Sequence, residues 1–167
     1  MEEQQTILVV NDLEANRKMI STLITPMGYT VIEAVDGQEA LECFKEYKPD
    51  LLILDLIMPK LDGYEVCKLL KTDPETKTVP IILITGLVDD QSHLKALELG
   101  ADDFLAKPFN IHFLKARLKS LLSLKKLLDD NRQFQERLKQ DNIELLQKLI
   151  GTQDVTIFAL AKLGRVS

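Results

Sequence analysis

The chain has 167 residues, 46% of them hydrophobic and 28% charged, which suits one globular domain with an additional segment and excludes a disordered chain. No stretch approaches the roughly 20 apolar residues of a membrane-spanning helix, and residues 1–5 lack the features of a signal peptide, so we expect a cytoplasmic protein. Residues 1–110 carry 20 acidic and 10 basic side chains, which disfavours nucleic acid and anionic membranes as direct partners.

Segments typical of strands and helices alternate along the chain. Residues 51–54 are four consecutive large aliphatics, which predicts a strand buried on both faces, as in parallel sheets. By the same criteria the five expected strands cover residues 6–10, 30–34, 51–55, 79–85 and 103–107. The helices expected between them cover residues 14–27, 36–44, 64–70 and 94–100, and a long helix starts near residue 110.

Local chemistry predicts the starts and the buried faces of some helices. Asp36 and Asp62 are the expected N-caps of the second and third helices, with Glu39 as the capping-box partner of Asp36. The apolar faces of the first and fourth helices are expected to comprise Met19, Ile20, Leu23 and Ile24, and Leu94, Ala96, Leu97 and Leu99, respectively.

The order of these elements predicts the fold class. Alternating strands and helices with short connections build parallel sheets with right-handed crossovers and helices on both faces. We therefore predict an α/β fold with a doubly wound, five-stranded parallel sheet. In such folds ligands bind at the carboxyl ends of the strands.

Polar side chains stand at several of these strand ends. Asn11 and Asp12 follow the first strand, while Asp55, Thr85 and Lys107 end the third, fourth and fifth strands. If these strands are neighbours, the carboxylates come close and repel each other unless a cation lies between them. Mg²⁺, which prefers oxygen ligands, is the expected cation. A carboxylate nucleophile, a metal ion, a hydroxyl and an ammonium are the groups needed to accept a phosphoryl group on a carboxylate.

Five motifs in order and at matching spacing resemble the receiver domain of bacterial two-component response regulators over residues 5–122. The motifs are residues 9–12 (VVND), 54–59 (LDLIMP), Asp62 with Gly63, 84–86 (ITG) and 100–109 (GADDFLAKPF). The resemblance implies a flavodoxin-like sheet with strand order 2-1-3-4-5. It also implies a sensor histidine kinase or a phosphotransfer protein as the partner.

The resemblance implies a magnesium site around the phospho-acceptor Asp55. Asp12, Asp55 and the backbone carbonyl of Ile57 would bind Mg²⁺, and Asn11 would contribute through a water molecule. The family usually has two acidic residues after the first strand, whereas the first of the two is Asn11 here. Because the amide removes one negative charge, we hypothesise that Mg²⁺ binds more weakly while phosphorylation survives.

The resemblance also implies the groups that bind the phosphoryl group and respond to it. Asp55 would attack a phosphohistidine, Lys107 would pair with the transferred group, and small Gly86 would leave room for it. Thr85 would then move inward and Phe104 would fill the vacated space. This switch would change the surface formed by the fourth helix, the fifth strand and the fifth helix.

Two apolar side chains, Ile57 and Leu87, are expected to flank this pocket. Neither can orient an attacking water, so we predict slow loss of the phosphate.

The histidines and cysteines have no predicted chemical role. His93 and His112 fall in helices away from the strand ends, so we expect exposed or half-buried side chains. Cys43 and Cys67 form no Cys-x-x-Cys motif, and we interpret them as buried thiols of a reducing compartment.

Residues 110–150 contain no Gly or Pro, which predicts one long helix. A stripe along it has spacings of 3, 4, 3, 4, 4, 3 and 4, which is typical of a coiled coil with one stutter-like irregularity. Asn131 in this seam favours a parallel two-stranded coil, so we expect a homodimer, and a lone helix folded back on the domain is the alternative. The stripe consists of Leu124, Leu127, Asn131, Phe134, Leu138, Asn142, Leu145 and Leu149.

Residues 152–163 begin a new helix-like segment that resembles the stretch leading into HD-GYP phosphodiesterase domains of receiver-linked enzymes. No His-Asp pair follows before residue 167, so we expect no phosphodiesterase activity in this chain. Either the chain is a piece of a longer regulator or the output domain was lost. We divide the chain into a receiver (1–122), a coiled-coil signalling helix (123–150) and the start of a truncated or lost output segment (151–167).

Three other functions compete with a phosphorylated switch. A constitutive dimeric adaptor would leave the pocket unused. A dehalogenase-type phosphatase also uses an aspartyl nucleophile, but it needs a second acid where Ile57 stands. A flavin or nucleotide binder needs Gly, Ser or Thr after the first strand, where the acidic Asp12 and Glu14 would repel phosphate.

Overall fold

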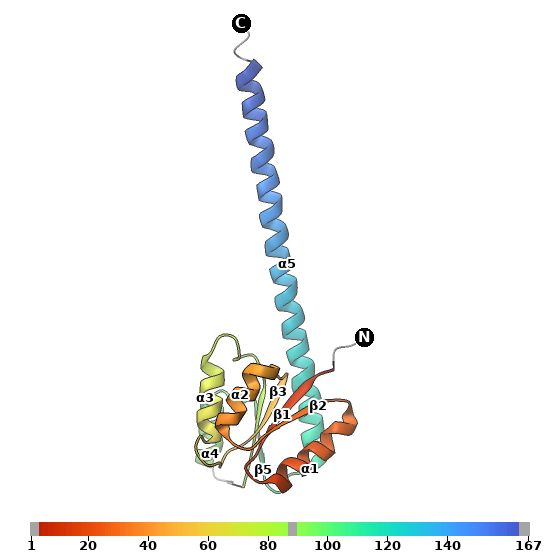
Figure 1. Cartoon of the computed structure of the whole chain (residues 1–167), viewed down its shortest axis with the longest axis vertical. Coiled ribbons are helices and arrows are strands. Elements are labelled where there is room, and N and C mark those ends of the chain that lie inside the picture. The colour runs from red at the N-terminus through yellow and green to blue at the C-terminus, as the bar shows by residue number, and fades with distance from the viewer. Residues whose placement is uncertain (1–3, 87–89, 164–167) are drawn as a thin grey trace. The chain divides into compact units, whose positions relative to one another are not determined.

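The computed structural model describes residues 4–86 and 90–163 (Figure 1). Contacts divide the chain into two units, residues 1–125 and residues 126–167. The first unit holds the sheet, and the described residues of the second unit, 126–163, are the later part of the last helix.

The sheet has five parallel strands in the order 2-1-3-4-5, which confirms the predicted fold. Val10 pairs with Leu54 and Asp55 pairs with Ile84, so the first, third and fourth strands end at the same edge. The strands are β1 (Thr6–Val10), β2 (Thr30–Ala34), β3 (Leu51–Asp55), β4 (Ile81–Thr85) and β5 (Asp103–Ala106).

Helices cover both faces of the sheet (Figure 1). One face packs against α2, α3 and α4, and the other packs against α1 and the beginning of α5, each through its own cluster of buried aliphatic side chains. β3 is therefore buried along its whole length, as its unbroken aliphatic run predicted. The helices are α1 (Glu14–Ile24), the short 3₁₀ helix η1 (Thr25–Met27), α2 (Gly37–Tyr47), α3 (Gly63–Thr72), α4 (Asp90–Glu98) and α5 (Ile111–Leu163).

The buried faces of two helices differ from the prediction. In α1 the buried side chains are Arg17, Ile20 and Ile24, whereas Met19 is 46% exposed. Met19 lies about 100° around the helix from Ile20, so the face that meets the sheet excludes it. Likewise α4 contacts the core through Ala96. Leu94 and Leu97, which were also predicted on the buried face of this helix, are exposed.

The N-caps of α2 and α3 are confirmed. The Asp36 carboxylate accepts the backbone N–H of Glu39 at 2.9 Å, but the Glu39 carboxylate accepts the N–H of Val35 instead of closing the box on Asp36. Asp62 and Glu65 do form a reciprocal capping box at the start of α3. The capping box therefore fixes the loop between β3 and α3 at the point where α3 begins.

The last helix is longer than predicted. It continues through Gly151 to Leu163, where we expected a new helix to begin. One glycine costs a helix only about 1 kcal/mol relative to alanine, which does not force it to end. Residues 164–167 lie outside the described part of the chain. Within the described residues, no helix combines the length and hydropathy required to cross a membrane.

Candidate functional site

Asp55 is the centre of a cluster at the carboxyl edge of the sheet. It ends β3 and is 7% exposed, and Asn11 and Thr85 beside it are also buried. The side-chain amide of Asn11 donates to Asp55 Oδ2 at 2.6 Å, and Lys107 Nζ lies 2.8 Å from the same oxygen. Among the described residues, the single hydrogen bond to Asp55 Oδ1 is a long one, 3.4 Å, from the Ile57 N–H. The sequence prediction that these residues converge is thus correct for Asn11, Asp55 and Lys107.

Close backbone packing fixes the position of Asp55. Gly63, the first residue of α3, donates its N–H to the carbonyl of Leu56 at 2.9 Å. A Cβ atom at Gly63 would meet the backbone carbonyl oxygen of Asp55 in a clash. Glycine is therefore required for α3 to start against the end of β3, and this contact holds the end of β3 that carries Asp55 in place.

The oxygen atoms available to a cation lie in two loops. Asp12, after β1, is exposed, and none of the described residues donates a hydrogen bond to its carboxylate. The Asp12 carboxylate, the Asp55 carboxylate and the Ile57 carbonyl would together offer only oxygen ligands, which would suit a hard cation such as Mg²⁺ that keeps several waters. The described residues hold no group of three His, Cys, Asp or Glu side chains suited to a metal, so a cation bound here would need water molecules to complete its coordination shell.

The remaining predicted residues lie around this cluster. Thr85 is fully buried at the end of β4, and its carbonyl accepts the Lys107 N–H at 2.7 Å. Among the described residues, no atom would lie within 4 Å of a Cβ atom added at Gly86. Phe104 is half-buried on β5 and stacks on the exposed ring of His93, with centroids 4.9 Å apart. Leu87 falls outside the described residues.

A mostly apolar hollow of about 410 Å³ adjoins the cluster through Lys107. It explains why Met19, which was expected in the core, is exposed: its side chain lines this hollow. The lining residues are Asn16, Met19, Ile20, Leu23, Lys107, Pro108, Phe109 and Ile111.

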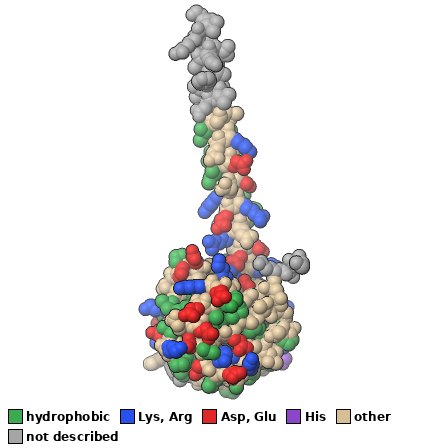
Figure 2. All heavy atoms as spheres, viewed as in Figure 1, with side chains coloured by type: hydrophobic (Ala, Val, Ile, Leu, Met, Phe, Trp, Pro, Cys, Tyr) green, Lys and Arg blue, Asp and Glu red, His purple; other side chains and the backbone are tan. Residues whose placement is uncertain are grey.

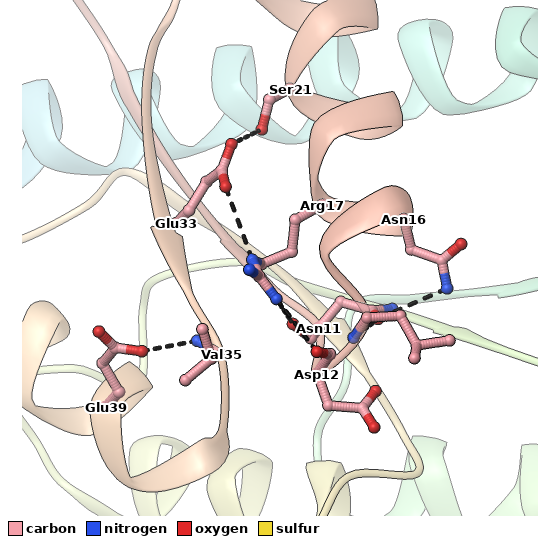
Figure 3. A network of polar contacts seen from close by, with 9 residues as sticks. Asn11, Asp12, Asn16, Arg17, Ser21, Glu33, Val35 and Glu39 are labelled. Carbon is pink, nitrogen blue, oxygen red and sulfur yellow. Dashed lines mark hydrogen bonds and ion pairs between the residues drawn. The ribbon is translucent and has the colours of Figure 1, made fainter.

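One group beside the site was missed in the sequence. Arg17 of α1 is buried and donates from Nη1 to the backbone carbonyls of Asn11 and Asp12 (Figure 3). Its position three residues before Ile20 and seven before Ile24 indicated the buried face of α1, and an arginine on that face must have polar partners. That periodicity was the signal that could have identified it.

Comparison with known proteins identifies the family. The sequence model of the response regulator receiver domain matches residues 7–119. The chain belongs to the response regulator receiver domain family. Mg²⁺ binding and phosphorylation of an aspartate are general features of these domains.

Curated relatives and solved structures agree with this assignment. The chain is 46% identical over 120 residues to the probable transcriptional regulator ycf27 of Porphyridium aerugineum, covering 72% of this chain and 49% of that protein. It is 42% identical over 127 residues to the response regulator PleD of Caulobacter vibrioides, covering 76% of this chain and 28% of PleD. The chain therefore spans about half the length, or less, of these relatives.

Two solved structures are similar to the receiver unit. The receiver domain of a signal transduction histidine kinase from Syntrophus aciditrophicus superposes with a TM-score of 0.68 at 37% identity, covering 71% of this chain and 90% of that one. A two-component response regulator from Clostridium difficile gives a TM-score of 0.67 at 32% identity, with coverages of 72% and 97%.

Proposed function

We propose that this receiver accepts a phosphoryl group on Asp55 in a Mg²⁺-dependent reaction and acts as a switch in two-component signalling. The observation that carries the proposal is the convergence of Lys107 and Asn11 on one oxygen of a buried carboxylate. Two donors on Oδ2 hold the carboxylate in one orientation, whereas the described residues give Oδ1 a single weak contact. A preorganised carboxylate beside a fixed ammonium suits in-line attack on phosphorus.

In the proposed reaction a carboxylate oxygen of Asp55 attacks the phosphorus of a phosphohistidine. The P–N bond breaks, and the imidazole leaves with the bonding electron pair. Lys107 balances the negative charge that spreads over the three equatorial oxygens. Mg²⁺, held by Asp12, Asp55 and the Ile57 carbonyl, would supply further charge neutralisation.

The response to phosphorylation would start at Thr85 and Phe104. Thr85 is buried beside the acceptor, whereas Phe104 is half-buried and stacked on His93 at the edge of α4. A shift of the Thr85 hydroxyl toward the phosphoryl group would vacate space next to the core, and Phe104 would enter it. Because Phe104 packs against α4, this movement would alter the surface of α4, β5 and α5.

The phosphoryl donor is proposed to be a sensor histidine kinase or a phosphotransfer protein. It must approach Asp55 from the carboxyl edge of the sheet, next to the apolar hollow that Lys107 shares with α1. Met19 and Phe109 offer apolar contact area in this hollow, which Lys107, the ion-pair partner of Asp55, also lines.

The proposed function is tested by asking whether the protein forms an acyl phosphate. Incubation with acetyl phosphate and Mg²⁺ is expected to add one phosphoryl group to the intact mass, and hydroxylamine is expected to remove it, because it cleaves acyl phosphates. EDTA should prevent the gain. The phosphate should also be lost slowly, over much longer than seconds, because apolar Ile57 cannot orient water. A hydroxylamine-stable gain, or no gain at any Mg²⁺ concentration, would instead favour a constitutive adaptor.

We propose the same division of the chain as above: a receiver (1–122), a signalling helix (123–150) and the start of an output segment (151–167). Along α5, the apolar members of the predicted stripe are between 46% and 66% exposed, although a single helix in water gains nothing from exposing them. Charged side chains are interspersed with them (Figure 2). In a parallel homodimer each asparagine of the stripe meets its own copy, which satisfies both amides.

Substituting one residue of the stripe tests the dimer. Leu138→Lys is expected to convert a wild-type dimer into a monomer, because it places two like charges in the seam. Gln140→Lys, two residues away on another face of α5, is the control and should remain dimeric. Light scattering gives the mass of each variant. A monomeric wild type, or a dimeric Leu138→Lys, would contradict pairing through this stripe.

A further inference from the structure

A buried guanidinium links the loop after β1 to the neighbouring strand β2. Arg17 is 9% exposed, and burying a charged side chain is unfavourable unless it is paired. Its Nη1 donates to the backbone carbonyl of Asn11 at 2.6 Å and to that of Asp12 at 3.2 Å (Figure 3). The two residues whose backbone it holds are those that stand at the proposed cation site.

The other side of the guanidinium faces β2. Arg17 Nε lies 3.6 Å from Glu33 Oε2, which is an ion pair without a hydrogen bond, and this buried Nε has no hydrogen-bond partner. Glu33 is itself oriented by the hydroxyl of Ser21, which donates to Oε1 at 2.7 Å. Arg17 thus pairs through Nε with a carboxylate on β2, while its Nη1 donates hydrogen bonds to the loop after β1 (Figure 3).

We propose that Arg17 is a positioning residue for the cation site, a role that rests on the proposed Mg²⁺-dependent function. By holding both carbonyls, Arg17 fixes the backbone from which the side chains of Asn11 and Asp12 project. The Asp12 carboxylate points away from the guanidinium (Figure 3) and is left free of described hydrogen-bond donors. Asn11 meanwhile reaches Asp55. One guanidinium therefore holds the backbone of both loop residues that belong to the proposed cation site.

A positioning role and a purely electrostatic effect of Arg17 predict opposite changes in Mg²⁺ affinity when this residue is substituted. Arg17 carries a positive charge next to the cation site, so electrostatics alone predicts tighter Mg²⁺ binding once that charge is removed. A positioning role predicts weaker binding, because the Asp12 carboxylate loses its fixed direction. Groups that orient metal ligands typically change metal affinity by about 10- to 100-fold when they are substituted. A rise in the Mg²⁺ dissociation constant would therefore support the positioning role, and a fall would support the electrostatic explanation.

The experiment is an Mg²⁺ titration of the full chain, followed by amide NMR shifts of the loops after β1 and β3. Arg17→Met is expected to raise the Mg²⁺ dissociation constant roughly tenfold. Arg17→Lys keeps the charge but loses the planar fork, so it should also weaken binding, by less. Lys18→Met removes the same charge from an exposed neighbour on α1 and should leave the dissociation constant unchanged.

A second readout excludes a general loss of structure. With acetyl phosphate as donor, the Arg17 variants should need more Mg²⁺ for half-maximal phosphorylation but reach the wild-type rate at saturating Mg²⁺. Unchanged or tighter Mg²⁺ binding in both Arg17 variants would overturn the positioning role while leaving the proposed function intact. Failure of the wild type to bind Mg²⁺ would overturn both. A lowered rate at saturating Mg²⁺ in Arg17→Lys would also contradict a role confined to the cation site.

Discussion

Replacing Lys107 with methionine is expected to slow phosphorylation of Asp55 by acetyl phosphate roughly 10²- to 10³-fold, the usual cost of losing one group that stabilises transition-state charge. Lys107 Nζ is 2.8 Å from the Asp55 carboxylate and partly shielded from water, so its charge is screened less than that of a surface lysine. Methionine keeps the length and apolar contacts of the side chain. The initial rate of mass gain at saturating Mg²⁺ is the measurement.

A matched control separates this local effect from the loss of a positive charge. Lys68→Met removes one charge from an exposed position on α3 and should leave the rate within twofold of wild type. If Lys107→Met were phosphorylated at the wild-type rate, the ion pair with Asp55 would be a feature of the resting fold only, and the proposed electrostatic role would be wrong.

Replacing Asn11 with aspartate is expected to make the stability of the receiver depend on Mg²⁺. The wild-type amide donates to the buried Asp55 carboxylate at 2.6 Å, whereas an aspartate would bring a second negative charge to the same oxygen. Loss of a hydrogen bond to a charged group costs about 1.5–3 kcal/mol. In EDTA the free energy of unfolding should therefore fall by about 2 kcal/mol, and millimolar Mg²⁺ should restore much of it.

Urea denaturation in EDTA and in Mg²⁺ measures this effect, and an Mg²⁺ titration should give tighter binding for Asn11→Asp than for wild type. Gln38→Glu adds the same charge at an exposed position on α2, where its side chain bonds Glu42, and its stability should not depend on Mg²⁺ to this extent. Equal Mg²⁺ affinities of wild type and Asn11→Asp would refute the idea that the amide weakens the site.

Much of the fold could be predicted because its signals are local. Unbroken aliphatic runs identify strands buried on both faces, and the alternation with helices allows few topologies. The position of Asp55 followed from the same logic, because a residue that ends a buried parallel strand must lie at the carboxyl edge of the sheet.

The wrong predictions of buried residues concern contacts that the local sequence pattern does not specify. Met19 and Leu97 look like core residues by hydropathy, but each helix contacts the sheet along a narrower face than its apolar residues cover. The end of the long helix was misplaced because a single glycine was given too much weight.

The polar contacts of the site were also only partly predictable. Asn11 was expected to act through a metal-bound water, and the direct bond from its amide to Asp55 was not foreseen. The helical periodicity could have placed Arg17 on the buried face of α1, but its partners, which are backbone carbonyls and a strand residue 16 positions away, are not indicated by any local motif.

The most direct test of the central claim is the intact mass of Asp55→Asn after incubation with acetyl phosphate and Mg²⁺, compared with wild type and with Asp73→Asn. Asp73 is exposed after α3, so its substitution removes a carboxylate without touching the site. The account predicts that wild type and Asp73→Asn each gain one phosphoryl group and that Asp55→Asn gains none. Equal gains in all three proteins would show that Asp55 is not the acceptor and would contradict the account.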